Sequence, residues 1–272
     1  MKNAVLITGA STGIGYDCAV TLAKRGFRVF GGVRSQNSHD KLRAQASNIT
    51  PLILDVTVPS EIQRAYEIIS AESPETFHLV NNAGIVVAGP VETLSIADVR
   101  RGFDVNFFGL VEVTQTFLPL IRKTKGRIVN ISSTSGLIPA PFLGAYSASK
   151  YAVETFSDCL RWELAPAGVK VIVIEPGPIA TPLWEKSFSS PSQIENGNFA
   201  AALPRFRELV GKMETTAIPA EKVSLAILHA LTCKNPSARK IVGSFGAKVQ
   251  VKMSRWLPQK WVDRAIARML FG

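Results

Sequence analysis

Short apolar segments alternate with amphipathic segments along most of the 272-residue chain. The apolar segments predict strands at 5–8, 27–33, 52–55, 77–81, 127–132, 169–175 and 240–243. The amphipathic segments predict a helix from the glycines before residue 15 to Arg25, and further helices at 40–46, 61–71, 95–122, 146–164 and 220–233. Strands that alternate with helices form βαβ units, and continuously apolar strands are typical of parallel sheets covered on both faces. We therefore predict one α/β domain with a doubly wound, seven-stranded parallel sheet.

This alternation is interrupted between about 182 and 216, where prolines, serines and an Asn-Gly-Asn sequence replace the periodic pattern. A long irregular segment inside a compact domain is usually a lid or a binding loop. We therefore predict a substrate lid over 182–216, within a domain that spans 1–252, followed by a separate C-terminal tail at 253–272.

The composition indicates a folded protein with a sizeable core, since 46% of the residues are hydrophobic and 19% are charged. The apolar runs are much shorter than the roughly 18–20 residues that cross a bilayer. Cys18, Cys159 and Cys233 are odd in number and have no metal-ligand spacing, which favours free thiols in a reducing cytoplasm. The three histidines are far apart in sequence, so we predict no metal site.

Positive charge is concentrated at the C-terminal end. From Lys234 onward there are nine lysines and arginines against Asp263 alone, so this stretch supplies +8 of the net charge of +10. The rest of the chain is nearly neutral, and we expect no nucleic-acid partner. In the tail, Lys260, Arg264 and Arg268 lie on one helical face, and another face carries the apolar residues Trp261, Ala265, Ile266, Met269 and Leu270. Such a helix either lies on an anionic membrane surface or packs on its own protein or a sister subunit.

A glycine-rich loop, Thr8-Gly-Ala-Ser-Thr-Gly-Ile-Gly15, joins the first predicted strand to the first helix. Glycines allow the backbone to approach a pyrophosphate, and the helix N-terminus offers free N–H groups. The spacing differs from G-x-G-x-x-G, but the strand-to-helix context is the one that a dinucleotide-binding Rossmann fold requires.

The end of the second strand bears on the choice of cofactor. NAD-specific folds place a carboxylate there for the ribose 2′-hydroxyl, whereas this chain has Val33-Arg34. Arg34 suits the 2′-phosphate of NADP(H), and Ser11 in the glycine loop can add a hydroxyl donor. The alternative is that Arg34 is an ordinary solvated arginine. We predict NADP(H).

Three further residues form a candidate catalytic group. Tyr146 and Lys150 are four residues apart, so on a helix they share one face. A neighbouring ammonium favours the phenolate and should lower the tyrosine pKa from about 10. Ser133 follows an apolar strand and can bring a hydroxyl to the same place. A lone Tyr-x-x-x-Lys pair is usually only a surface pair, so the other motifs decide its meaning.

Taken together, these features resemble the short-chain dehydrogenase/reductase family over nearly the whole chain. The motifs occur in the family's order: the glycine loop at 8–15, Asp55-Val56, Asn81-Asn-Ala-Gly84, Asn106, Ser133, Tyr146-x-x-x-Lys150 and Pro176 to Thr181. The resemblance implies a catalytic set of Asn106, Ser133, Tyr146 and Lys150. Together with the loop chemistry above, it implies that the cofactor is bound by Gly9, Ser11, Thr12, Gly13, Ile14, Gly15, Arg34, Asp55, Val56, Asn82, Ala83, Gly84, Tyr146, Lys150, Pro176, Gly177, Ile179 and Thr181.

The resemblance also implies a mechanism, in which a hydride passes between nicotinamide and a carbonyl or alcohol carbon. Ser133 would hold the substrate oxygen and Tyr146 would exchange the proton. Lys150 would lower the Tyr146 pKa and bind the nicotinamide ribose, and Asn106 would hold a water.

The substrate itself is less well defined by the sequence. Apolar residues at 139–143 and in the lid suit a hydrophobic ketone or alcohol, or merely pack the lid. They are Phe142, Leu143, Trp184, Phe188, Phe199 and Phe206. The length, the basic residue after the second strand and the tail resemble the hydroxysteroid and retinol dehydrogenase branch. Two alternatives remain: a ketoreductase for acyl chains on an acidic carrier protein, and a non-catalytic NADP-binding regulator. In the family, the helices at 95–122 and 146–164 pair between subunits, which implies a homodimer or homotetramer.

Overall fold

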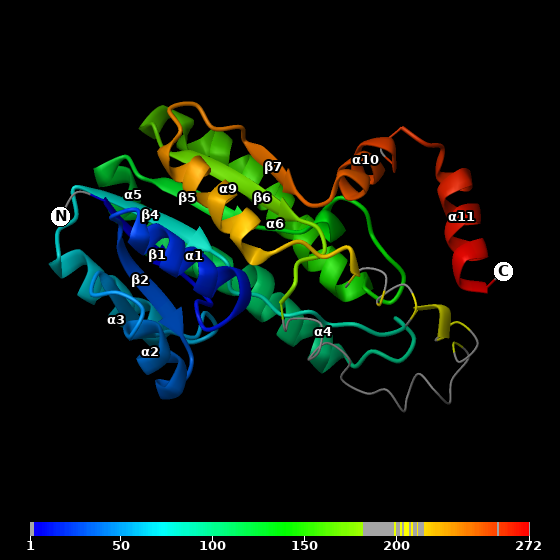
Figure 1. The fold of residues 1–272 in the computed structure, drawn as a ribbon, viewed down its shortest axis with the longest axis horizontal. Helices are drawn as coiled ribbons and strands as arrows, with labels where there is room; N and C mark the ends of the chain where they lie inside the picture. Colours follow the sequence, from blue (N-terminus) through cyan, green and yellow to red (C-terminus); the bar gives the residue numbers. More distant parts are fainter. Residues whose placement is uncertain are drawn as a thin grey trace.

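The computed structural model describes residues 3–181, 199, 202, 204–206, 208, 211, 215–254 and 256–271. Its centre is a parallel sheet of seven strands in the order β3-β2-β1-β4-β5-β6-β7 (Figure 1). The strands are β1 Asn3–Ile7, β2 Arg28–Val33, β3 Ile49–Ile53, β4 Thr76–Asn81, β5 Arg127–Ile131, β6 Lys170–Pro176 and β7 Arg239–Val242. The strand order reverses between β1 and β4, where doubly wound sheets bind their ligands at the carboxyl ends of the strands. The prediction of a doubly wound, seven-stranded parallel sheet is confirmed.

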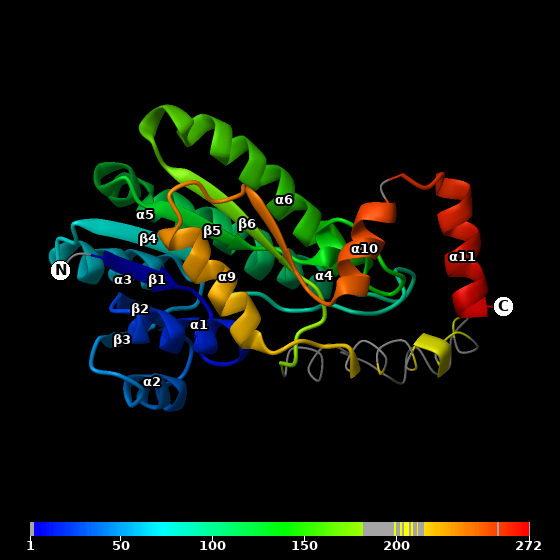
Figure 2. The same ribbon diagram turned by 45° about the horizontal axis from the view of Figure 1, so that its top comes forward.

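Helices cover both faces of the sheet, as predicted (Figure 2). One face carries α1 Gly13–Lys24, α2 Gln36–Arg43 and α9 Ala220–Thr232, whose buried side chains share one apolar cluster with the strands. The other face carries α3 Pro59–Ala71, α5 Gly109–Thr124 and α6 Gly144–Leu164, which share a second cluster. Short 3-10 helices occupy Thr134–Gly136 and Ala165–Ala167.

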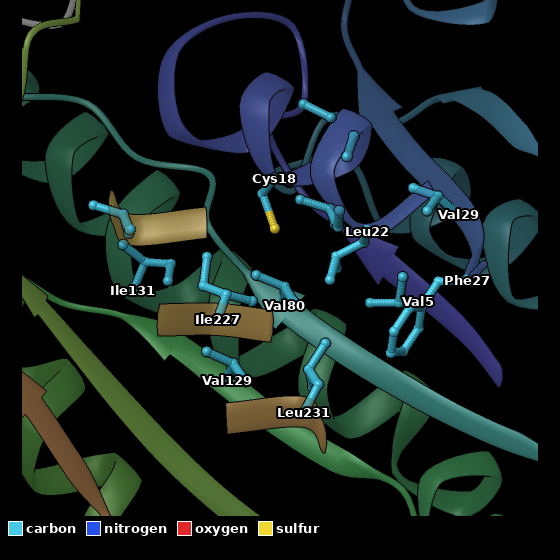
Figure 3. Packing of buried hydrophobic residues seen from close by; sticks show 14 of the residues in the cluster. Val5, Cys18, Leu22, Phe27, Val29, Val80, Val129, Ile131, Ile227 and Leu231 are labelled. Atoms are coloured by element: carbon cyan, nitrogen blue, oxygen red, sulfur yellow. The ribbon is translucent and has the colours of Figure 1, made fainter. Parts of the chain in front are cut away.

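The first of these clusters explains why the strands are apolar throughout (Figure 3). Cys18 and Leu22 of α1 and Ile227 of α9 meet Val80 and Val129 of the central strands. On the opposite face Phe77 of β4 stacks on Phe117 of α5 with ring centroids 5.4 Å apart. Because both faces of each central strand are buried, alternation with polar residues is not required.

The predicted continuous helix over 95–122 is wrong in one respect. The chain forms α4 Ile96–Phe103, then a π-helix at Asp104–Phe108, and then α5. A π-helical turn inserts one residue into the helical register, and such turns are frequent at functional sites. Asn106 lies in the middle of this turn.

The C-terminal region forms two helices, α10 Phe245–Ser254 and α11 Gln259–Phe271. Both lie at the end of the molecule opposite the N-terminus (Figures 1 and 2). Within the described part of the chain, no helix has the length and apolar character needed to cross a membrane. Phe199 and Phe206 of the predicted lid are described, whereas Trp184 and Phe188 lie outside the described residues.

Candidate active site

Tyr146 lies in the first turn of α6, at the carboxyl end of the sheet. The helix begins at Gly144, and Leu143 is its N-cap residue. The Tyr146 ring is only 7% exposed and packs with Val86, Ala88 and Leu143. Apolar contacts therefore fix the orientation of the Tyr146 ring.

Ser133 and Tyr146, both predicted to belong to one site, lie close enough for a side-chain hydrogen bond from Ser133 to act on the pKa of Tyr146. Ser133 directly precedes a 3-10 helix, and its Oγ also accepts a hydrogen bond of 3.1 Å from the backbone N–H of Ser135. That second bond fixes the rotamer of a side chain that is 9% exposed. The two hydroxyls are thus held side by side, as donors to a common oxygen must be.

Lys150 lies one turn further along α6, and its side chain is 4% exposed. Its Nζ donates a hydrogen bond of 2.9 Å to the carbonyl oxygen of Ile131 and lies 5.9 Å from the centroid of the Tyr146 ring. Burial lowers the pKa of Lys150 from 10.5 to about 8. The lysine is therefore mostly an ammonium at neutral pH, and the burial of this charge lowers the stability of the folded protein.

The expectation that Lys150 lowers the Tyr146 pKa is wrong for the protein in this state. Burial raises the pKa of Tyr146 above its ordinary value of 10, and only the hydrogen bond with Ser133 acts in the opposite direction. Desolvation of the phenolate outweighs a lysine that is engaged with a backbone carbonyl. Tyr146 is consequently protonated at neutral pH, which is the form required of a proton donor.

Asn106 is 1% exposed and is fixed by three hydrogen bonds. Its Oδ1 accepts from the Ile85 N–H at 2.8 Å, and its Nδ2 donates to the Ile85 carbonyl at 2.9 Å and to Ser149 Oγ at 3.0 Å. Ser149 Oγ in turn donates to the Tyr146 carbonyl at 2.7 Å. A Cβ placed on Gly84 would lie 3.3 Å from Asn106 Oδ1 and 3.6 Å from Lys150 Nζ, so Gly84 leaves space next to both.

Two polar contacts hold α6 against the sheet below these residues. Asn130 of β5 donates to Ser157 Oγ of α6 at 2.8 Å, and both side chains are fully buried. Arg239 of β7 pairs with Glu154 and Asp158 of the same helix. These contacts position the helix that carries Tyr146 and Lys150.

The burial of Lys150 predicts a measurable dependence of stability on pH. In the unfolded chain its pKa is near 10.5, and in the folded protein it is about 8. Between these values the unfolded state holds the extra proton, so the lysine makes stability rise with pH in this window. Relative to Lys150→Met, the wild type should gain about 3 kcal/mol of unfolding free energy from pH 8 to 10.5, as measured by urea denaturation. Parallel curves for the two proteins would contradict a lowered pKa.

The glycine loop lies directly against the turn that follows β4. Thr8 Oγ1 accepts hydrogen bonds of 3.0 Å from the backbone N–H groups of Asn82 and Ala83. Asn82 Nδ2 donates to the carbonyls of Thr8 at 2.9 Å and of Gly9 at 3.1 Å. Gly9 has a φ of +67°, and a Cβ there would lie 2.8 Å from the Ala83 Cα. Only glycine allows the two backbones to approach this closely.

The same loop fits the pyrophosphate of a dinucleotide. Helix α1 begins at Gly13, so its free N–H groups face the carboxyl edge of the sheet. The predicted Ser11, Thr12, Ile14 and Gly15 belong to this turn. A Cβ on Gly13 would lie 3.1 Å from Thr181 Cγ2, so the turn also touches the segment after β6.

The segment Pro176 to Thr181 leaves the sheet beside this loop. Pro176 ends β6, and the N–H of Gly177 donates to the Val242 carbonyl at 2.9 Å. Ile179 is buried and forms an isolated bridge with Ile218. The structure therefore brings the glycine loop, the turn at 82–84 and this segment together along one edge.

Arg34 and Asp55 lie further along the edge, after β2 and β3. Arg34 is 68% exposed, with Nη1 3.8 Å from Asp55 Oδ2. The Asp55 carboxylate also accepts from the N–H and the hydroxyl of Thr57, at 2.9 and 2.7 Å. Both residues line a cavity of about 410 Å³ together with Val56, Thr57, Arg101, Asp104, Val105, Phe108, Gly109 and Glu112. The predicted cofactor residues thus form two groups. One group lies at the glycine loop, where a pyrophosphate would bind, and the other lines this cavity.

Sequence reasoning missed several participants. Ser149 links Asn106 to Tyr146, and the side chain of Thr8 ties the glycine loop to the turn at 82–83. Both residues belong to quoted motifs, but spacing alone gives them no role. The Ile131 carbonyl that binds Lys150 has no signal in the sequence, because every residue has such a group.

A sheet of this topology with a Ser-Tyr-Lys group at its carboxyl edge defines a class of nicotinamide-dependent oxidoreductases. A family model described as short chain dehydrogenase matches residues 3–192, and the chain belongs to this family of oxidoreductases. This confirms the resemblance at the level of the family.

Known proteins agree with that assignment. The chain is 36% identical to a 3-amino-tetrahydro-pyrrolizinone reductase of Xenorhabdus hominickii, over 91% of this chain and 84% of the relative. It is 32% identical to an NADPH-dependent 3-dehydrocapnine reductase of Ornithobacterium rhinotracheale, over 97% and 95% of the two chains. A crystal structure of a short chain dehydrogenase from Burkholderia cenocepacia J2315 in complex with NADP superimposes with a TM-score of 0.76 at 25% identity, covering 97% of each chain.

Proposed function

We propose that the protein is an NADP(H)-dependent oxidoreductase that interconverts a carbonyl and a secondary alcohol on a hydrophobic, steroid-, retinoid- or lipid-like substrate. The observation that carries the proposal is the burial of Ser133, Tyr146 and Lys150 in one site, with Lys150 Nζ 5.9 Å from the centroid of the Tyr146 ring. A protein that only senses the cofactor has no use for a buried ammonium next to a protonated phenol, since burial of Lys150 lowers stability.

Bound nicotinamide would supply or accept the hydride, and the protein would supply position and protons. In reduction, Ser133 and Tyr146 donate hydrogen bonds to the carbonyl oxygen, and Tyr146 transfers its proton as negative charge develops there. Lys150, held 5.9 Å from the centroid of the Tyr146 ring, would bind the nicotinamide ribose. Asn106 holds the backbone of Ile85 by two hydrogen bonds. Through Ser149 it also holds the first turn of α6.

NADP(H) is supported by the residues near the end of β2. Arg34 keeps most of its guanidinium in solvent and directly precedes the N-terminal turn of α2, whose N-cap residue is Ser35. A cation and a helix N-terminus both favour a phosphate. A relative named as NADPH-dependent and a structural neighbour solved with NADP support the same choice.

A hydrophobic substrate is supported by the aromatic residues beside α6. Phe142 precedes the N-cap residue of the helix, and its ring makes edge contacts with Phe199 and Phe206, with centroids 5.8 and 4.8 Å apart. Two aromatic residues of the predicted lid therefore lie next to the segment that leads into Tyr146, which supports an apolar substrate.

A substrate screen tests this function. Purified protein with NADPH should oxidise the cofactor in the presence of at least one class among steroids, retinoids, acyl thioesters and small ketones. We expect turnover with an apolar ketone and less with small polar ketones. A preference for small polar ketones would contradict the hydrophobic substrate class, and absence of turnover across all classes would contradict the catalytic proposal.

We also expect a homodimer or homotetramer. An exposed stripe on α6 includes Tyr151 and Trp162, which are 41% and 66% exposed, and Phe108 at the π-helix is 57% exposed. Phe108 and Phe156 both pack on Phe107, so α6 and the π-helix form one surface. Light scattering at micromolar concentration should give an oligomer, which the double substitution Phe108→Glu/Trp162→Glu should dissociate.

The matched control is Trp261→Glu, which changes an equally exposed tryptophan on α11. That variant should keep the oligomeric mass. A monomeric wild type, or dissociation by Trp261→Glu alone, would contradict pairing through α6.

A further inference from the structure

Helix α11 contacts the rest of the protein along one narrow stripe. Among its described side chains only Val262 and Ile266 are partly buried, and the others are exposed. Ile266 packs against the apolar cluster that contains Phe142 and Phe206. The helix is therefore docked by the stripe of Val262 and Ile266, and its other described side chains are exposed.

An apolar surface lies next to the docked stripe, on the exposed side. Trp261 is 63% exposed and Met269 is 43% exposed. Trp261 lies one position from Val262, so about 100° around the helix, and Met269 lies three positions from Ile266, so about 60° around it. Before α11, Trp256 is 88% exposed, and Leu257 is 41% exposed. Two exposed indoles this close together are unusual for a surface that meets only water.

Cations flank this surface. Lys260, Arg264 and Arg268 are exposed and repeat every four residues, so they form a stripe adjacent to that of Trp261. The nearby Asp263 accepts a hydrogen bond of 2.7 Å from Gln259. Around α11, the order is thus a cationic stripe, an apolar stripe and the docked stripe.

We propose that the exposed face of α11 and the turn before it binds the surface of an anionic lipid bilayer. Tryptophan prefers the boundary between headgroups and acyl chains, where its ring is apolar and its N–H can reach water. Cations beside it are attracted to anionic headgroups. The helix is not of the kind that crosses a membrane, so it lies in the interface.

A second copy of the chain fits this surface less well. Antiparallel pairing of two α11 helices would place their cationic stripes near each other, with only Asp263 in each helix to offset the repulsion. The bilayer satisfies both the apolar and the cationic stripe at once. Because the docked stripe touches the Phe142 cluster, the bound membrane would lie next to the substrate lid; this last step rests on the proposed function.

The test is co-sedimentation of the full chain with phosphatidylcholine vesicles, with and without phosphatidylglycerol. The wild type should sediment with the anionic vesicles and remain in solution with pure phosphatidylcholine. Trp256→Ser/Trp261→Ser should weaken binding by about tenfold or more, because the indoles no longer partition. Lys260→Gln/Arg264→Gln/Arg268→Gln should weaken it by about a hundredfold, since each cation near the surface contributes about 1 kcal/mol, or about fivefold.

Matched controls separate this surface from general effects. Ile68→Ser removes an exposed apolar side chain from α3, and Lys24→Gln/Arg25→Gln/Arg43→Gln removes the same charge from exposed positions at the C-terminal ends of α1 and α2. Both should bind like the wild type, and every variant should keep its wild-type melting temperature. The proposal is overturned if the wild type does not sediment with anionic vesicles or if the control triple loses as much binding as the tail triple. It is also overturned if the tail substitutions dissociate the oligomer. Vesicle binding is measured without substrate, so a negative result would not contradict the proposed catalysis. Equally, a failed substrate screen would not contradict membrane binding.

Discussion

Tyr146→Phe should reduce turnover by about 10²–10⁴-fold or more, while binding of NADPH stays nearly unchanged. The substitution removes the hydroxyl that lies close to the Ser133 side chain and keeps the ring that packs with Val86 and Leu143. The reaction would then lack a protein group that donates a proton to the developing alkoxide. Steady-state kinetics with the substrate found by the screen, together with a fluorescence titration of NADPH, separates the two effects.

The control is Tyr66→Phe, which removes a hydroxyl from a tyrosine of α3 whose ring packs against Phe117. It should leave turnover close to the wild-type value. Near-normal turnover of Tyr146→Phe would show that the proton comes from another group. An equal loss in both variants would assign the effect to the fold.

Cofactor choice is the second large effect that we expect. NADP(H) should bind at least about tenfold tighter than NAD(H), because a charge-assisted hydrogen bond contributes roughly 1.5–3 kcal/mol. The Arg34 side chain is 68% exposed, so solvent screening places the expected effect toward the lower end of that range. Arg34→Ala should remove most of the preference without weakening NAD(H).

Three further variants sharpen this test. Arg34→Asp should reverse the preference by repelling the 2′-phosphate; it is better suited than a carboxylate at Val33, which is fully buried. By resemblance to the family, Asp55 would contact adenine, which both cofactors share, so Asp55→Asn should weaken NADP(H) and NAD(H) alike. Arg43→Ala, at an exposed position at the other end of α2, should change nothing. Equal affinities in the wild type, or a preference that survives Arg34→Ala, would leave Arg34 an ordinary solvated arginine.

Periodicity predicted most of the fold because the strands and helices here bury regular faces. The apolar strands at 77–81 and 127–132 could be placed nearly to the residue, since their neighbours are turn-forming. The break between α4 and α5 could not be predicted, because the side-chain periodicity continues through Asn106. The π-helix is accompanied by tertiary hydrogen bonds from Asn106 to Ile85 and Ser149, which local propensity does not contain.

The sequence predicted that Tyr146 and Lys150 lie close together, but not their electrostatics. Four-residue spacing placed Tyr146 and Lys150 on one face of α6. Spacing says nothing about depth, and it is burial that raises the pKa of Tyr146 and lowers that of Lys150. The ion pair of Arg34 with Asp55 was missed for a similar reason, because it joins two strands whose order in the sheet had not been assigned.

Transfer of deuterium tests the central claim most directly. Wild-type protein is mixed in a single turnover with NADPH that carries deuterium at both C4 positions of the dihydronicotinamide and with the ketone found by the screen. The product alcohol should contain a single deuterium on the carbinol carbon, and Tyr146→Phe should form that product at least about a hundredfold more slowly. A product without deuterium on that carbon, or formation at the same rate in both proteins, would contradict hydride transfer assisted by Tyr146.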